Sequence, residues 1–288
     1  KLANTSKTPE TLWARFAPVS APSTKAPYAA TIDDNGHPPV VFLHGFMMSR
    51  ALWADNLDDL SFVSRPIVVE HLGHGRSPAP SNDADYGVNR FIDALEFYRK
   101  ELGYDQWTLC AHSFGAGVAL RYALEHPNCV SGVVFTNSLS AFGAIEDSRS
   151  DRDKRQQAEP ETSPDSMTQL EQLPYHPRRM KYVSASVRDA LIQDAERLDL
   201  SSLAKLGRIA GPQTNVRGKL HTLQRPALLV NGAKERAFQP IRQSLEGVSS
   251  NLEIEDREAG HSVNAEMPQV FNQSVRRFLR ELKWQRKK

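Results

Sequence analysis

Ser113 stands in a pattern that can expose a nucleophile at the end of a strand. Residues 107–111 form a short apolar run typical of a buried strand, and residues 114–125 have the composition of a helix. In Ala111-His112-Ser113-Phe114-Gly115, small residues stand two positions before and after the serine, as in G-x-S-x-G. This spacing allows a sharp turn that lifts the hydroxyl clear of the sheet, although Ala111 adds a methyl group where the backbone is crowded. The pattern predicts a nucleophilic serine; the alternative is a strand, a turn and a helix with an incidental serine.

A serine hydroxyl needs a base to become nucleophilic, and the base needs a carboxylate that fixes its tautomer. Glu235 follows the apolar run 226–230, and His261 lies between the strand pattern 251–255 and the last helix. Functional groups in open parallel sheets gather in loops beyond the carboxyl ends of the strands, so these residues and Ser113 are expected at one end. They supply a nucleophile, an acid and a base in the chain order Ser, Glu, His. The alternative interpretation is that Glu235 is a solvated surface charge and that His261 is an ordinary loop histidine.

The elements that must position these residues are indicated by short apolar runs that alternate with amphipathic patterns. Two short strands at 11–19 and 28–32 are predicted first. The main strands are predicted at residues 40–43, 66–69, 107–111, 130–135, 226–230 and 251–255. Helices are predicted at 49–60, 88–102, 114–125 and 239–245, and the last helix has an apolar stripe that ends at Leu282. This alternation predicts the α/β class, with a mostly parallel, doubly wound sheet flanked by helices on both faces.

The strand pattern is interrupted between residues 141 and 221. Residues 141–166 are strongly polar and predict a mobile surface loop, which we expect to gate the site. Helical patterns resume at 167–173, 184–198 and 200–209. The predicted organisation is therefore a first part of the core at 1–140, an inserted helical cap or lid at 141–221, and a second part of the core at 222–288.

Composition narrows the class of partner. The chain has 288 residues, 36 of them basic and 34 acidic, so a formal net charge of +2 gives no reason to expect a nucleic acid or an anionic membrane as partner. No apolar run approaches the roughly 20 residues of a membrane span. Cys110 and Cys129 form neither a disulfide framework nor a metal-ligand cluster. We therefore expect a cytoplasmic protein that acts on a small molecule without a cofactor or metal; the oligomeric state stays open.

Five short pieces carry a resemblance to a known family. In order, they are V-V-F-L-H-G-F (40–46), G-H-G-R-S (73–77), A-H-S-F-G (111–115), N-G-A-K-E (231–235) and A-G-H-S (259–262). Together they resemble the α/β-hydrolase superfamily, in particular its serine hydrolases with a helical cap, a group that includes esterases and carbon–carbon bond hydrolases. The resemblance covers about residues 38–138 and 224–284, and it implies the α/β-hydrolase fold with an inserted helical cap.

The resemblance implies a role for each matching residue. Ser113 would be the nucleophile, His261 the general base and then the acid, and Glu235 the group that orients the histidine. The backbone N–H groups of Phe46 and Phe114 would form the oxyanion hole. The family more often has Asp where Glu235 stands, so the longer side chain must approach the imidazole from a different backbone distance.

Other polar residues near these motifs have plain alternatives. Asp256 is a second candidate acid because it is near His261 in the sequence, but it lies on the strand side and is expected to point elsewhere. His44 is expected to pack the oxyanion loop, and His112 either contacts the substrate or packs beside the nucleophile. His71 and His74 lie in a loop without the further ligands that a metal site requires.

The resemblance also narrows the reaction. A serine at the turn excludes the branches that use aspartate there, namely haloalkane dehalogenases and epoxide hydrolases. Phe46 after His-Gly differs from the His-Gly-Gly-Gly run of hormone-sensitive-lipase-like esterases. The first hypothesis is hydrolysis of a carboxylic ester through an acyl-enzyme. The second is cleavage of a carbon–carbon bond in an acidic substrate held by Arg178, Arg179 and Arg76, which are otherwise solvated charges. The third is a receptor-like module that binds a ligand and retains the fold.

Overall fold

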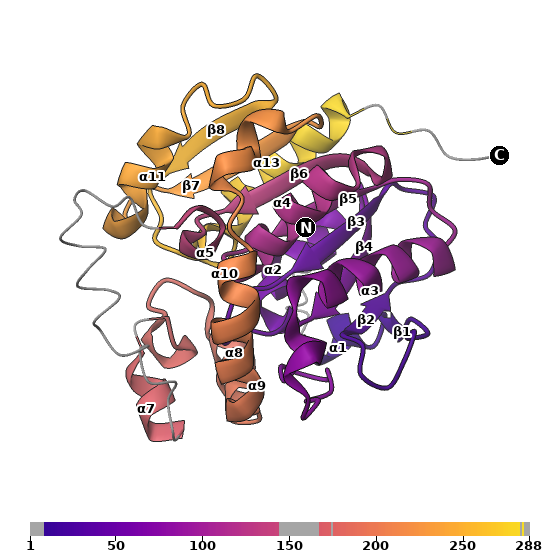
Figure 1. Cartoon of the computed structure of the whole chain (residues 1–288), viewed down its shortest axis with the longest axis vertical. Coiled ribbons are helices and arrows are strands. Elements are labelled where there is room, and N and C mark those ends of the chain that lie inside the picture. The colour runs from indigo at the N-terminus through magenta and orange to yellow at the C-terminus, as the bar shows by residue number, and fades with distance from the viewer. Residues whose placement is uncertain (1–8, 144–166, 174, 283, 285–288) are drawn as a thin grey trace, which may run out of the picture.

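An eight-stranded β-sheet forms the centre of the computed structural model, which describes residues 9–143, 167–173, 175–282 and 284 (Figure 1). β1 pairs antiparallel with β2 and β2 antiparallel with β4, whereas β3 to β8 run parallel, so the predicted mostly parallel sheet is confirmed. In spatial order the strands are β1 (Ala17–Pro18), β2 (Tyr28–Thr31), β4 (Arg65–Glu70), β3 (Pro39–Leu43), β5 (Trp107–Ala111), β6 (Val130–Thr136), β7 (Ala227–Gly232) and β8 (Leu252–Arg257).

Strand β3 marks the point where the winding of the chain reverses. It pairs with β4 on one side and with β5 on the other, so the chain leaves β3 in one direction, forms β4, and returns across β3 to β5. Loops at such a reversal diverge and leave a crevice at the carboxyl ends of the strands. The predicted oxyanion loop after β3 and the predicted nucleophile after β5 therefore come from the two strands that flank this crevice.

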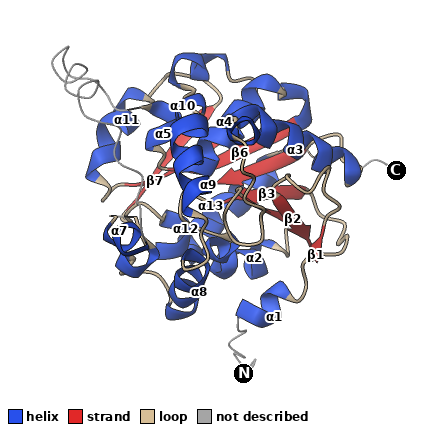
Figure 2. Cartoon of the chain, turned by 60° about the horizontal axis from the view of Figure 1, so that its bottom comes forward, coloured by secondary structure: helices blue, strands red, loops and turns tan. Residues whose placement is uncertain are grey.

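Helices cover both faces of the sheet (Figure 2). Val41 and Leu43 of β3 belong to the core that includes α3, α4 and α11, whereas Val40 and Phe42 pack in the core that includes α2 and α13. Burial on both faces explains why the strands read as continuous apolar runs. The predicted helices are confirmed as α2 (Ala54–Leu60) after a 3₁₀ turn (Arg50–Trp53), α3 (Val88–Glu101), α4 (Phe114–Glu125), α11 (Gln239–Ser244) and α13 (Pro268–Glu281), with a short α12 (Val263–Glu266) before the last.

Short helices occupy the described part of the chain between β6 and β7. They are α5 (Leu139–Phe142), α7 (Met167–Gln172), α8 (Ala185–Ala195), α9 (Leu200–Lys205), a π-helical turn (Leu206–Ala210) and α10 (Gly211–Gln213). Leu170, Leu198 and Leu203 pack together with Met47 and against Phe46, just beyond the end of β3. These leucines of the segment between β6 and β7 therefore lie beside the loop at the carboxyl end of β3; the predicted division into a core and an inserted cap stays a prediction. The predicted loop and gate at 141–166 lie outside the described residues except for 141–143.

The N-terminal segment differs from its prediction. Residues 11–19 were expected to be a strand, but α1 (Pro9–Trp13) and the two-residue β1 occupy this stretch. Leu12 and Phe16 have helical spacing, and both are buried in the core beside α2. The guanidinium of Arg50 stacks over the ring of Trp13 at 4.2 Å. Tertiary packing therefore selects a helical turn here.

Among the described residues, no helix combines the length and apolar content needed to cross a membrane.

Candidate active site

Ser113 lies at the turn between β5 and α4. Its backbone has φ 51° and ψ −118°, a conformation that residues with a Cβ rarely adopt, so the turn is strained. The start of α4 also approaches the end of β3 closely. A Cβ on Gly115 would lie 2.6 Å from the carbonyl oxygen of His44 and 2.7 Å from that of Leu43, which explains the glycine in the motif. The predicted strand, turn and helix around Ser113 are therefore present, and the serine is half-buried.

The loop after β3 lies directly against the serine. A Cβ on Gly45 would lie 3.0 Å from the Cβ of Ser113 and 2.5 Å from Nδ1 of His112. The next residue, Phe46, has a backbone N–H without an acceptor in the part of the chain that the structure describes, as does Phe114, the first residue of α4. N–H groups at a helix N-terminus lack intrahelical partners and can donate to a negatively charged oxygen. The two predicted donors thus lie on the elements that flank Ser113.

Glu235 and His261 form a hydrogen-bonded pair. Nδ1 of His261 lies 2.9 Å from both Oε1 and Oε2 of Glu235. The side chain of His261 is 15% exposed and that of Glu235 is 7% exposed. A carboxylate only accepts, so Nδ1 donates and Nε2 keeps a free lone pair, the form that a general base needs. The structure therefore brings the predicted acid and base together.

Gly232 allows the loops that carry Glu235 and His261 to touch. A Cβ on Gly232, at the end of β7, would lie 1.8 Å from the carbonyl oxygen of Gly260, just after β8. Beside this contact the N–H of Lys234 donates to the carbonyl oxygen of Ala259 at 2.9 Å. The two loops therefore pack backbone to backbone. This close approach fixes the distance that the longer Glu235 side chain spans to the imidazole.

Asn137 and Tyr175 also hold Glu235, and sequence reasoning missed both. Nδ2 of Asn137 donates to Oε2 of Glu235 at 2.8 Å and to the carbonyl oxygen of Gly232 at 3.0 Å. The hydroxyl of Tyr175 lies 3.4 Å from Oε1 of Glu235, and its ring centroid lies 4.6 Å from that of His261. Asn137 directly follows β6, so the rule that places functional groups after strand ends could have found it. Tyr175 comes from the helical insertion and has no such signal.

Opposing effects act on the ionisation of Glu235. Burial favours its neutral form, but the hydrogen bond and electrostatic attraction of His261 favour the carboxylate, and Asn137 and Tyr175 add two donors. The balance holds the pKa of Glu235 below its ordinary value. The group that would orient His261 is therefore ionised at neutral pH.

His112 links the serine turn to the histidine loop. It is buried, its ring centroid lies 4.8 Å from that of His261 in an edge-to-face arrangement, and its Nε2 lies 3.2 Å from the hydroxyl of Ser262. These are the contacts of a packing residue. Because His112 is next to Ser113 in the chain, they bring the serine turn beside His261. The predicted substrate contact of His112 stays a prediction.

Three buried histidines brace the loop after β3, the predicted oxyanion loop. Nδ1 of His44 donates to the carbonyl oxygen of Gly45 at 2.7 Å, and Nε2 of His74 accepts the N–H of Met47 at 3.2 Å. Nε2 of His71 donates to the carbonyl oxygen of His44 at 2.8 Å. Burial lowers the pKa of His71 to about 3 and that of His74 to about 4, so both rings are neutral and serve as hydrogen-bond bridges. The structural role predicted for His44 is confirmed.

The second candidate acid and the candidate arginines have other partners. Asp256 lies within β8 and accepts hydrogen bonds from Asn231 and Arg242, so it points away from His261 as expected. Arg178 pairs with Glu171 and Glu196, and Arg76 is exposed, in both cases away from the site. Of the three arginines proposed to hold an acidic substrate, only Arg179 lines a cavity beside His261.

One group of potential metal ligands was not foreseen. Ligand atoms of Glu96, His126 and Cys129 lie within 4.8 Å of one another, at the end of the sheet opposite the serine turn. Both oxygens of Glu96 accept hydrogen bonds from Arg99 at 2.8 Å, and one also accepts the hydroxyl of Tyr122. A carboxylate paired with a guanidinium in this way is an ion-pair partner rather than an open ligand.

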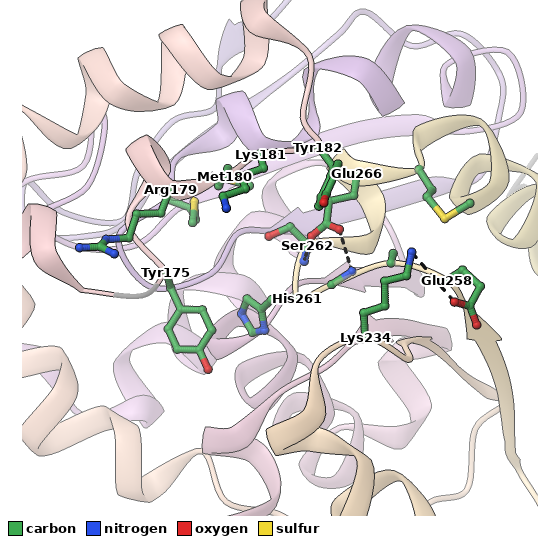
Figure 3. Close-up of a pocket in the computed structure, with 14 residues that line it drawn as sticks. Tyr175, Arg179, Met180, Lys181, Tyr182, Lys234, Glu258, His261, Ser262 and Glu266 are labelled. Atoms are coloured by element: carbon green, nitrogen blue, oxygen red, sulfur yellow. Dashed lines mark hydrogen bonds and ion pairs between the residues drawn. The ribbon is translucent and has the colours of Figure 1, made fainter.

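A cavity of about 430 Å³ opens beside His261 (Figure 3). Its wall combines the loop after β8 with residues 175–182 of the helical insertion. Its volume is within the usual range for small-molecule sites. It is lined by Met48, Tyr175, Arg179, Met180, Lys181, Tyr182, Lys234, Glu258, Ala259, Gly260, His261, Ser262, Glu266 and Met267.

The chain belongs to the alpha/beta hydrolase fold family, whose sequence profile it matches over residues 38–268. It is 26% identical over 254 residues to a Bacillus subtilis protein described as a 2-succinyl-6-hydroxy-2,4-cyclohexadiene-1-carboxylate synthase, a match that covers 85% of this chain and 91% of the relative. Among solved structures it is similar to carboxylesterase CesB of Bacillus subtilis, with a TM-score of 0.73, 20% identity and 94% of each chain covered. An epoxide hydrolase of Bacillus megaterium gives a TM-score of 0.73 at 20% identity, with 92% of this chain and 100% of the other covered.

The match to the family profile supports a hydrolytic activity, and the similarity to the solved structures confirms the fold. An esterase and an epoxide hydrolase match equally well, so the fold alone does not separate one reaction from another. The choice of reaction must come from the side chains at the ends of the strands.

The close contact at Gly115 generates a stability prediction. Gly115→Ala forces a methyl group into two backbone carbonyls, so we expect a loss of about 1–3 kcal/mol in the free energy of unfolding. Gly218→Ala is the matched control, because a Cβ there meets nothing within 4 Å. Urea unfolding of both variants measures the difference, and equal midpoints would contradict the packing described.

The buried neutral histidines generate a pH prediction. The unfolded chain protonates His71 and His74 below the ordinary value of 6.5, whereas the folded chain does so only near the lowered values of about 3 and about 4. Stability therefore falls as the pH drops from 6.5 toward 4, by up to about 1.4 kcal/mol per pH unit for each ring. Urea unfolding at pH 7, 6 and 5 measures this slope. We expect His74→Gln to reduce it and the exposed control His221→Gln to leave it unchanged.

Proposed function

We propose that the chain hydrolyses carboxylic esters through an acyl-enzyme on Ser113. The observation that supports this proposal best is the Glu235–His261 pair, hydrogen-bonded at 2.9 Å beside the strained turn of Ser113. A nucleophile, a base with a free Nε2 and an ionised acid are the parts that acyl transfer needs. The two unpaired N–H groups of Phe46 and Phe114 add donors for the oxyanion.

The reaction would proceed in two halves. Nε2 of His261 accepts the proton of Ser113 as Oγ bonds to the carbonyl carbon, and the N–H groups of Phe46 and Phe114 donate to the oxygen that becomes negative. The ester C–O bond then breaks, and the leaving alcohol takes the proton from His261. In the second half, water gives its proton to His261 and bonds to the acyl carbon, and Ser113 leaves with that proton.

Glu235 would act by staying ionised throughout. Its carboxylate holds the Nδ1–H of His261 and stabilises the imidazolium that forms in each half-reaction. Asn137 and Tyr175 donate two further hydrogen bonds to this carboxylate, which stabilise its charge although the side chain is buried. We also propose that α7, α8 and α9, which pack against Phe46 and Met47, form the cap, with residues 141–221 as the inserted domain.

A carbon–carbon bond lyase or hydrolase is the second candidate. The Bacillus subtilis relative described as a synthase favours it, since the similarity extends over 85% of this chain. The same triad residues would serve this reaction, so ester hydrolysis and carbon–carbon bond cleavage are distinguished by their substrates. For the proposed ester hydrolase we expect turnover of p-nitrophenyl butyrate and no turnover of a dienoate. A receptor-like module, the third candidate, would turn over neither.

Replacement of the nucleophile tests the proposal. We expect Ser113→Ala to reduce kcat/KM on p-nitrophenyl butyrate by about 10³-fold or more, because no other group can form the acyl-enzyme. Ser131→Ala is the matched control, since Ser131 is also half-buried but lies at the start of β6, the opposite end of the sheet. Retention of wild-type turnover in Ser113→Ala on every accepted ester would refute the assignment.

Tyr175→Phe tests the role of the hydroxyl beside Glu235. Tyr175 is one of the donors that hold the pKa of Glu235 below its ordinary value, so its loss raises that pKa and the carboxylate becomes neutral at a higher pH. We expect the acidic limb of the kcat/KM profile to move to higher pH by a few tenths of a unit. Tyr104→Phe removes a comparable hydroxyl, bonded to Arg65 at 2.7 Å, and should leave the limb in place. An identical shift in both variants, or none in Tyr175→Phe, would contradict this role.

A further inference from the structure

The cavity beside His261 lies on one side of the proposed triad. His261 and Ser262 line it, but Ser113, Phe46 and Phe114 do not. In ester hydrolysis the histidine gives its proton to the leaving alcohol, so the leaving oxygen must lie next to the imidazole. If the proposed function holds, the cavity therefore receives the alcohol side of the ester, and the acyl group lies on the other side of Ser113.

The wall of the cavity is apolar and adaptable. Met48, Met180 and Met267 come from three separate parts of the chain and line it together with the rings of Tyr175 and Tyr182. Methionine side chains are unbranched and flexible, so they adapt to ligands of varied shape. Figure 3 shows Tyr175 on the same side of the cavity as His261, and Tyr182 across from it. This wall suits a flexible hydrocarbon chain better than a rigid polar group.

Charged groups at the cavity leave a positive excess. Among the residues that line the cavity, Arg179, Lys181 and Lys234 are basic and Glu258 and Glu266 are acidic, an excess of one positive charge; the ionised Glu235 is bonded to His261 and does not itself line the cavity. Glu266 is already engaged, because its oxygens accept the N–H groups of Gly260 at 2.7 Å and Ser262 at 3.2 Å.

The two lysines differ in their surroundings. Lys234 pairs with Glu258 only at 4.0 Å and with both side chains exposed, an arrangement that contributes little. Lys181 forms no ion pair within the residues that the structure describes. A single excess charge matches a carboxylate better than a doubly charged phosphate.

We propose that the cavity selects esters whose leaving alcohol is a flexible apolar chain that ends in a carboxylate. The three methionines would hold the chain, and Lys181 and Lys234 would attract the carboxylate at the mouth of the cavity. This inference names the substrate class of the proposed ester hydrolase and rests on that function.

A pair of esters with one acyl group tests the inference. Hexyl butyrate and the butyrate ester of 6-hydroxyhexanoate differ in the carboxylate at the end of the leaving chain. We expect the wild-type protein to favour the charged ester by about tenfold in kcat/KM at low salt, and by less at 0.5 M salt, since exposed charges are screened. The double substitution Lys181→Gln and Lys234→Gln should reduce this ratio to about one, whereas Lys219→Gln, an exposed lysine distant from the cavity, should not change it.

The outcomes separate the inference from the proposed function. Hydrolysis of both esters with a ratio near one, or a ratio that the double substitution leaves unchanged, would overturn the inference while ester hydrolysis stands. Failure to hydrolyse either ester, together with p-nitrophenyl butyrate, would overturn the proposed function and the inference with it. A ratio that depends on both salt and the two lysines supports the inference.

Discussion

The hydrogen bond between Glu235 and His261 is the interaction on which the rest of the site depends. It requires the loops after β7 and β8 to meet, and they meet because Gly232 has no side chain to keep the two backbones apart. The parallel register of β7 and β8, which pairs Gly232 with Arg257, carries both loops to the same end of the sheet. A side chain on Gly232 would separate the acid from the base. The distance between the backbones of these two loops therefore sets the distance between the acid and the base.

A buried carboxylate is costly unless donors surround it, and the structure provides them from different elements. His261 follows β8 and Asn137 follows β6, while Tyr175 comes from the helical insertion. Phe46 follows β3, Ser113 follows β5 and Glu235 follows β7. Each parallel strand from β3 to the sheet edge at β8 is therefore followed by one residue of the proposed site. The strain at Ser113 and Met47, which both have positive φ, lies in the two loops beside the reaction site. Packed histidines and glycine contacts hold that strain in place.

Local patterns in the sequence predicted most of the sheet and the meeting of Glu235 with His261 at its carboxyl end, and they supply the residues of the proposed triad. The inner strands are buried on both faces, so their apolar runs are continuous, and the groups that follow them are found by the topology of parallel sheets. Asn137 was missed although the same rule applies to it. Tyr175 and the bracing by His71 and His74 could not be predicted, because these contacts join segments whose separation in the chain has no local signal. At the N-terminus, Leu12 and Phe16 are buried in the core beside α2, and a short apolar segment does not reveal its docking partner.

The central claim is that Ser113 is an activated nucleophile, and its reaction with a fluorophosphonate tests this most directly. Cleavage after Lys100 and Arg121 releases residues 101–121, a peptide in which Ser113 is the one serine, so its mass identifies the modified residue. The account predicts a single adduct on this peptide in the folded protein and none after unfolding in urea, because reactivity depends on His261 and Glu235 being in place. Absence of an adduct in the folded protein, or modification of another serine in its place, would contradict the account.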